Sequence, residues 1–179
     1  MGPNRQSSFS RGFPVLCAAS MLLNLAFGQV VKPKVSRVAP TVLFICEHGA
    51  AKSLIAAAYF DKLAKDQRLP HRAAFRGVNP DSALNPVAKR GLEQDGLNVS
   101  GSKPALVTQK DVEEAARIVT LGCSLPPGTR VGPQVTNWDD IPSPSQNYSD
   151  ARDQIKKQVR KLVDDLASER RAGKQETER

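Results

Sequence analysis

The sequence predicts one α/β domain of three layers, built on a four-stranded parallel sheet. Short apolar segments rich in β-branched residues alternate with longer segments of helical periodicity, as in parallel sheets with right-handed crossovers. The first apolar segment, residues 41–45, has the continuous apolar character of a strand buried on both faces. The chain of 179 residues is long enough for one such core and leaves no room for a second domain.

The remaining elements are predicted from periodicity and from turn residues. Residues 52–65 carry apolar side chains at helical spacing, and residues 72–78 form a strand closed by Asn79-Pro80. Asn85-Pro86 is typical of a helix start and Gly96 of its end. The other predicted elements are a short helix (109–115), a strand (116–121), a weaker strand (134–137) and a long amphipathic helix (149–167).

Both ends of the chain lie outside the predicted domain, which spans residues 41–168. Residues 1–28 have the features of a secretory signal, with Arg5 and Arg11 before a mainly apolar segment and the small residues Ala26 and Gly28 at its end. Residues 29–40 are expected to be a linker and residues 169–179 a polar tail. If this segment is a signal peptide, the protein is exported to the periplasm or the medium, and removal of the signal leaves no integral membrane segment. Otherwise it is cytoplasmic.

The charge distribution does not indicate a nucleic-acid partner. The formal net charge is +8, but residues 1–40 contain five bases and no acid, which leaves +3 for the rest of the chain. There the bases alternate with acids, as on a solvated helix face. No metal site is expected, since the only histidines, His48 and His71, lack neighbours at ligand spacing. No nucleotide-binding glycine motif occurs either, so no cofactor is predicted.

The segment from Cys46 to Ser53 carries the predicted chemistry. It follows the first strand and enters the first helix, where backbone N–H groups and the helix dipole converge on one point. We therefore expect a phosphate-binding loop with Cys46 as a thiolate nucleophile and Ser53 as a hydrogen-bond donor to its sulfur. The alternative is that Cys46 is only a small buried residue at a strand end. The expected oxyanion-binding residues are Glu47, His48, Gly49, Ala50, Ala51 and Lys52.

This layout resembles the low-molecular-weight protein tyrosine phosphatase family and its arsenate reductase relatives. Their signature is a cysteine, five residues, an arginine, and then serine or threonine. Residues 76–80, 85–88, 94–100 and 119–123 each resemble a family segment in the same order. The sequence departs from the family where Lys52 replaces the arginine, Gly49 replaces an asparagine that braces the loop, and His48 replaces a glycine.

The resemblance implies further site residues. In the family a late loop supplies an aspartate that protonates the leaving group, and by similarity this acid is Asp140, with Asp139 as its rival. In the arsenate reductases a cysteine just after the third strand attacks the nucleophilic cysteine, and Cys123 matches it by position. No second cysteine follows Cys123 before Trp138, so an external thiol would have to complete that cycle.

Three functions remain open at this stage. The first is a phosphomonoesterase of the phosphotyrosine type, in which Cys46 forms a thiophosphate intermediate. The second is arsenate reduction by Cys46 and Cys123. The third is an oxyanion-binding module whose catalysis is weakened by lysine at position 52, because an ammonium group lacks the planar bidentate grip of a guanidinium. All three imply a small oxyanion or a phosphorylated substrate.

Overall fold

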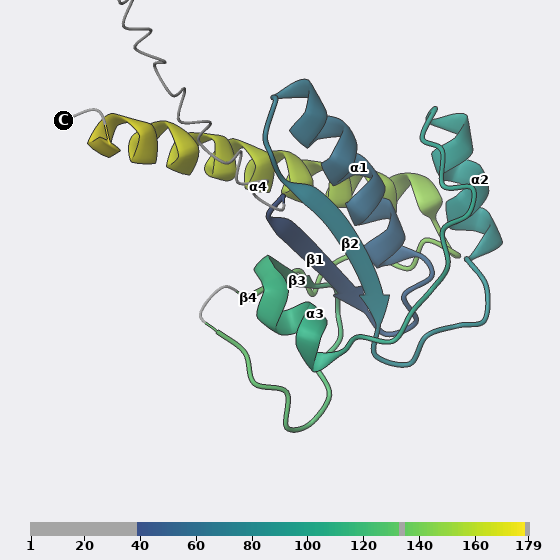
Figure 1. Ribbon diagram of the computed structural model, residues 1–179. Coiled ribbons are helices and arrows are strands. Elements are labelled where there is room, and N and C mark those ends of the chain that lie inside the picture. Colours follow the sequence, from purple (N-terminus) through teal and green to yellow (C-terminus); the bar gives the residue numbers. More distant parts are fainter. Residues whose placement is uncertain (1–38, 133–134, 178–179) are drawn as a thin grey trace, which may run out of the picture. The chain divides into compact units, whose positions relative to one another are not determined.

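The computed structural model describes residues 39–132 and 135–177 (Figure 1). The expected signal and nearly all of the expected linker lie outside the described residues. The elements, in chain order, are β1 (Thr41–Cys46), α1 (Lys52–Asp66), β2 (Arg72–Gly77), α2 (Pro86–Gln94), α3 (Gln109–Glu114), β3 (Ala115–Thr120), β4 (Val135–Asn137) and α4 (Tyr148–Thr177).

The four strands form one parallel sheet in the order β2-β1-β3-β4. Strand β1 is central and pairs with β2 on one side and β3 on the other, with Cys46 opposite Gly77. The carboxyl ends of the strands therefore meet at one edge of the sheet, where Cys46 ends β1. The predicted four-stranded parallel sheet is confirmed.

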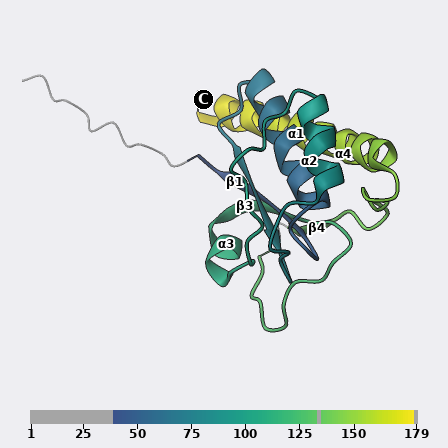
Figure 2. The ribbon, with the colours of Figure 1, turned by 90° about the vertical axis from the view of Figure 1, so that its right-hand side faces the viewer.

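Helices cover both faces of the sheet, which confirms the three-layer architecture. Figures 1 and 2 show α1, α2 and α4 together on one face and α3 on the other. Each face has its own apolar cluster: the larger one joins the sheet to α1 and α4, and the smaller one joins it to α3. Among the described residues, no helix combines the length and the apolar character needed to span a membrane.

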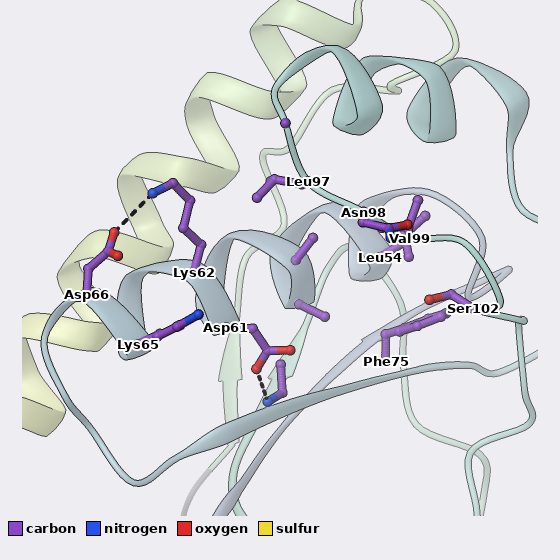
Figure 3. Close-up of a pocket in the computed structure, with 14 residues that line it drawn as sticks. Leu54, Asp61, Lys62, Lys65, Asp66, Phe75, Leu97, Asn98, Val99 and Ser102 are labelled. Atoms are coloured by element: carbon purple, nitrogen blue, oxygen red, sulfur yellow. Dashed lines mark hydrogen bonds and ion pairs between the residues drawn. The ribbon is translucent and has the colours of Figure 1, made fainter.

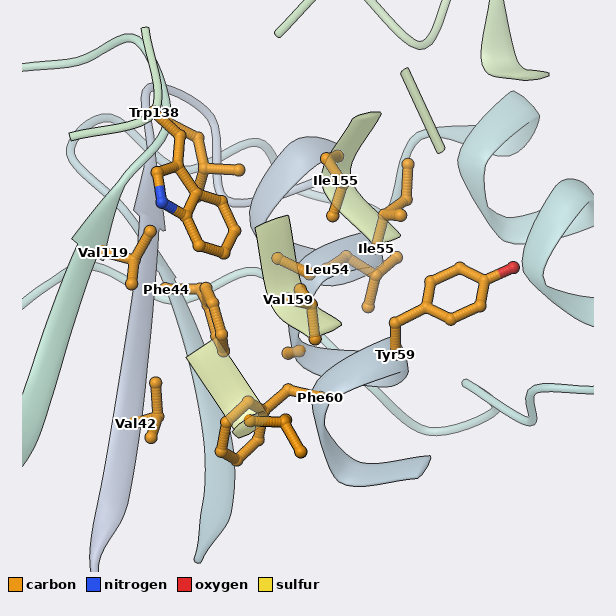
Figure 4. Packing of buried hydrophobic residues seen from close by; sticks show 14 of the residues in the cluster. Val42, Phe44, Leu54, Ile55, Tyr59, Phe60, Val119, Trp138, Ile155 and Val159 are labelled. Atoms are coloured by element: carbon orange, nitrogen blue, oxygen red, sulfur yellow. The ribbon is translucent and has the colours of Figure 1, made fainter. Parts of the chain in front are cut away.

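The larger cluster is centred on Phe44 of β1 (Figure 4). Its ring lies 5.7 Å from that of Phe60 and 5.9 Å from that of Trp138, both in tilted arrangements typical of aromatic pairs. Val42 and Phe44 are fully buried on this face, while Leu43 and Ile45 are buried on the α3 face. The uninterrupted apolar sequence of β1 thus reflects burial on both sides.

Helix α4 is longer than the sequence pattern predicted. It ends at Thr177 rather than at residue 167, although the side chains of residues 168–176 are exposed. Glu169 pairs with Arg117 at 2.7 Å, and Arg170 donates to the carbonyl of Arg68 at 2.8 Å. The expected polar tail therefore continues the helix. Its Glu, Arg, Ala, Lys and Gln residues favour helix without needing an apolar face.

A partly buried carboxylate joins the three helices on the larger face. Asp95, at the end of α2, accepts hydrogen bonds from the hydroxyl groups of Tyr59 and Tyr148, each at 2.8 Å, and pairs with Arg152 at 3.3 Å. Burial, followed by the hydrogen bond and charge of Asp95, raises the pKa of both phenols. The ring of Tyr148 lies directly against Gly91 of α2, where an added Cβ would be 2.2 Å from the ring.

This contact predicts that Gly91→Ala destabilises the domain by about 1–3 kcal/mol, because the methyl group and the Tyr148 ring cannot share the same space. Gly173→Ala is the matched control, since a Cβ at this helical glycine has no heavy atom within 4 Å. That substitution should stabilise by about 0.5–1 kcal/mol, the usual difference between the two residues within a helix. Urea unfolding measures both changes, and equal stability of the two variants would contradict the packing described.

Candidate active site

Cys46 lies at the carboxyl end of the central strand, with its sulfur beside a buried hydroxyl. Its Sγ is 3.1 Å from the Oγ of Ser53, and both residues are nearly inaccessible to solvent. Ser53 belongs to the first turn of α1, so strand and helix together fix the distance. A hydroxyl at this place can donate a hydrogen bond to a thiolate.

The loop that follows Cys46 is held by backbone hydrogen bonds from the segment after β2. The carbonyl oxygens of residues 46, 47, 48 and 50 accept from the N–H groups of residues 78, 79, 81 and 85, at distances of 2.8–3.2 Å. In a planar trans peptide the carbonyl and the N–H group point in opposite directions. The N–H groups of residues 47, 48, 49 and 51 must therefore point away from this segment.

These N–H groups remain available to a ligand. Among the described residues, none of the backbone N–H groups of residues 47–53 donates to another protein group. The N-cap of α1, Ala51, provides no side-chain acceptor, and the first turn contains no acid. A loop of unpaired N–H groups that leads into an uncapped helix N-terminus presents hydrogen-bond donors and positive potential to an anion.

The loop conformation depends on two glycines in close contact. Gly49 has a φ of +57°, and a Cβ there would lie 2.6 Å from the backbone nitrogen of Gly77. A Cβ on Gly77 would lie 2.8 Å from the backbone of His48 and Gly49. Gly77 is itself held from its other side, through hydrogen bonds to the backbone of Ala105 and Val107. No residue larger than glycine fits at either position.

Lys52 brings a full positive charge to the same loop. A Cβ atom built on Gly122 would lie 3.5 Å from the Nζ of Lys52. The ammonium group therefore lies over the turn that follows β3. Lys52 pairs with no carboxylate within the described part of the chain. Its charge is therefore available to a bound oxyanion.

Cys46 and the loop line a pocket of about 280 Å³. The wall is completed by Asp81, Asn85, Gly122 and residues 143–145. His48 lies at the rim, where its Nδ1 is 3.4 Å from Oδ1 of Asp81 and both side chains are more than half exposed. All the residues that we expected to bind an oxyanion belong to this wall, apart from Gly49. Gly49 instead packs against the backbone of Gly77 at the end of β2.

Asn85 is a site residue that the sequence pattern did not assign. Its backbone donates to the carbonyl of Ala50, its Oδ1 caps α2, and its Nδ2 donates to Ser145 at 2.9 Å. The bonds to two backbone N–H groups identify which side-chain atom is the oxygen. Asn85 thus braces the loop, a role that the resemblance had implied for position 49, where this chain has glycine. The Asn85-Pro86 pair indicated only a helix start.

The structure does not bring the two expected acids into this pocket. Asp139 and Asp140 line a separate cavity of about 270 Å³, together with Trp138 and side chains of α4 that include Lys157. The backbone of Asp139 comes near the site, since its carbonyl would be 3.7 Å from a Cβ on Gly122. The segment that carries the two carboxylates therefore lies beside the pocket, while the two residues line the neighbouring cavity.

Cys123 lies near the end of β1, which Cys46 terminates. Its side chain packs against the smaller apolar cluster, on the face of the sheet opposite to the cluster that contains Cys46. Its Sγ lies 3.5 Å from the carbonyl oxygen of Ile45, the residue before Cys46, and its side chain belongs to the apolar cluster beside α3. Burial raises the pKa of the Cys123 thiol to about 11, and the neighbouring Cys46 and Glu47 add smaller increases. Both cysteines are free thiols.

A larger cavity of about 630 Å³ lies away from this chemistry, between α1, β2 and residues 96–102 (Figure 3). Leu54, Phe75 and Val99 line it, and the ion pair of Lys62 with Asp66 at 3.1 Å lies at its margin. None of the residues of the Cys46 loop contributes to it. Among the described residues, no three His, Cys, Asp or Glu side chains form a group that could hold a metal ion.

Comparison with known proteins identifies the family. Residues 41–124 match the profile of the low molecular weight phosphotyrosine protein phosphatases. An arsenate reductase from Archaeoglobus fulgidus is 30% identical over 68% of this chain and 98% of its own, with a TM-score of 0.57. The chain therefore belongs to the low-molecular-weight phosphotyrosine phosphatase family, which includes related arsenate reductases.

Two further structures share the fold at lower identity. A thioredoxin-dependent arsenate reductase from Corynebacterium glutamicum is 24% identical with a TM-score of 0.63, and the alignment covers 74% of this chain but only 64% of that protein. An arginine phosphatase from Geobacillus stearothermophilus is 17% identical with a TM-score of 0.55, over 76% of this chain and 96% of that one. Comparison with curated protein sequences gives no significant match.

Proposed function

We propose that the protein is a cysteine-dependent phosphomonoesterase of the phosphotyrosine type. The observation that carries this proposal is the loop after β1, in which unpaired N–H groups, an uncapped helix N-terminus and the Lys52 ammonium surround Cys46. Such groups stabilise the charge on a transferring phosphoryl group without reorganisation during the reaction. Family membership supports the same chemistry.

The reaction has two steps in this proposal. The thiolate of Cys46 attacks phosphorus, so that an S–P bond forms while the bond to the leaving oxygen breaks. Ser53, 3.1 Å from the sulfur, stabilises the thiolate when the cysteine becomes the leaving group again. Water then attacks the thiophosphate and releases phosphate. By similarity to the family, Asp140 or Asp139 protonates the leaving oxygen, which would require the 138–142 segment to move toward the pocket.

The test is steady-state hydrolysis of p-nitrophenyl phosphate under reducing conditions. Cys46→Ser should abolish activity, while Lys52→Arg should raise kcat/KM by about tenfold or more, since a guanidinium binds an oxyanion through two hydrogen bonds. A folded wild-type protein without activity, or activity that survives in Cys46→Ser, would contradict the proposal. If only Lys52→Arg is active, the natural protein is an oxyanion-binding module.

Arsenate reduction is the second candidate, and it is favoured by a second thiol close to the chain at Cys46, since the Sγ of Cys123 lies 3.5 Å from the carbonyl oxygen of Ile45. In this reaction the Cys46 thiolate displaces one oxygen of arsenate, which leaves as water, and an S–As bond forms. The Cys123 thiolate then attacks the Cys46 sulfur, and arsenite leaves with the electron pair of the S–As bond. The resulting Cys46–Cys123 disulfide is then reduced by an external thiol. Because Cys123 packs on the other face of the sheet, its side chain must shift before it can attack.

The pKa of Cys123 predicts a pH dependence for this candidate. Since that pKa is about 11, the thiolate fraction rises about tenfold per pH unit from 7 to 10, and arsenate-dependent disulfide formation should rise with it. Mass spectrometry of alkylated peptides measures the disulfide, with Cys123→Ser as the control. Cys17, the third cysteine of the sequence, is replaced by serine in all samples so that it cannot form a competing disulfide. Oxidation that is independent of arsenate would count against the reductase.

A further inference from the structure

Strand β2 has an outer edge that is paired only at its last residue. It is an end strand of the sheet, and successive residues of a strand direct their backbone groups to opposite sides. The N–H group of Arg72 donates to the carbonyl of Pro40, on the β1 side. Residues 73, 75 and 77 therefore direct their N–H groups and carbonyls outward. Gly77 already pairs there with residues 105 and 107, which leaves residues 73 and 75.

Two of these outward backbone groups have no partner among the described residues, namely the carbonyl of Ala73 and the N–H of Phe75. The carbonyl of Phe75 accepts from Arg76 at 2.9 Å, and the N–H of Ala73 donates to Oδ1 of Asp61 at 2.7 Å. In a parallel ladder, a single residue of an added strand donates to the first free group and accepts from the second. Asp61 then lies where the carbonyl two residues earlier in that strand would bond. The added strand must therefore begin beside this carboxylate.

Asp61 is a carboxylate without a cationic partner. The neighbouring Lys62 pairs with Asp66 at 3.1 Å, and no base of the described chain lies within ion-pair distance of Asp61. Burial beside the groove raises the pKa of Asp61 more than the hydrogen bond from Ala73 lowers it. Its second oxygen accepts no hydrogen bond from the described residues. An ammonium group at that oxygen would stabilise the ionised carboxylate.

The cavity of about 630 Å³ beside this edge has the size of a ligand site (Figure 3). Residues that pair across a sheet place their side chains on the same face. The side chains of Ala73 and Phe75 belong to the face of the larger apolar cluster, so added residues opposite them would direct their side chains into the cavity. At the Phe75 end the cavity is lined by the apolar side chains of Leu54 and Val99.

We propose that this groove binds the N-terminus of an extended polypeptide, which adds as a short parallel strand to the edge of β2. The α-ammonium group of its first residue pairs with Asp61. Its second residue donates to the carbonyl of Ala73 and accepts from the N–H of Phe75, and an apolar side chain at its third residue fills the apolar end of the cavity. Main-chain bonds supply affinity, while the carboxylate and the apolar end supply specificity. No residue of the Cys46 loop takes part, so the inference is independent of the proposed function.

The experiment measures calorimetric binding of a hexapeptide with leucine at its third position, and of its N-acetylated form, to the full-length protein. We expect the free peptide to bind with a Kd below about 1 mM and the acetylated one at least about fivefold more weakly, the upper range for an exposed ion pair. Asp61→Asn keeps an acceptor for Ala73 but removes the charge, so it should bind both peptides equally weakly. Asp66→Asn, a carboxylate of the same cavity, is the matched control and should change the Kd by less than about twofold.

Glycine in place of the leucine should weaken binding by about tenfold, because the apolar end of the cavity is then left unfilled. Equal binding of the free and acetylated peptides to the natural protein, or no binding at about 1 mM, would overturn the proposal. Displacement of the peptide by excess inorganic phosphate would place it at the Cys46 loop instead. A dimer in sedimentation that excludes the peptide would show that a second copy of the chain covers this edge, and would equally overturn the proposal.

Discussion

The contact between Gly49 and Gly77 is the constraint on which the site depends. Because neither residue has a side chain, the loop after β1 can lie against the end of β2, within reach of the backbone N–H groups of residues 78–85. Those N–H groups donate hydrogen bonds to the loop carbonyls. Because the carbonyl and the N–H group of a peptide point in opposite directions, the loop N–H groups then face the pocket. The anion site is thus made by tertiary backbone contacts as much as by the local sequence.

Both reactions proposed for this protein use the same loop around Cys46. In both, as proposed, the sulfur of Cys46 would attack a tetrahedral oxyanion held by the loop N–H groups and by Lys52. The second reactive group decides the outcome: an acid at the leaving oxygen completes a phosphatase, and a second thiol completes an arsenate reductase. This chain has candidates for both, with Asp140 or Asp139 on the segment beside the pocket and Cys123 near the end of β1.

Most of the fold could be predicted from the sequence because its signals are local. Each of three elements can be recognised from residues that are close together in the sequence: the apolar strand β1, the loop that follows it and the amphipathic start of α4. The brace provided by Asn85 and the pairing of Asp81 with His48 could not be predicted, because they depend on how the segment after β2 returns to the loop. The end of α4 was also missed, since its residues show helix propensity without apolar periodicity. Asp139 and Asp140 were assigned by resemblance alone, which gives no side-chain positions.

The most direct test of this account is the affinity for inorganic phosphate, measured by calorimetry, in Gly77→Ala and Gly101→Ala. Gly77→Ala changes a residue outside the loop, but its methyl group displaces the loop backbone. Gly101→Ala strains a glycine with a φ of +83° in open space, so it controls for a general loss of stability. The account predicts that Gly77→Ala weakens phosphate binding by at least about tenfold, or ~1.4 kcal/mol, while Gly101→Ala leaves it unchanged. Equal, undiminished affinity in a folded Gly77→Ala protein would contradict it.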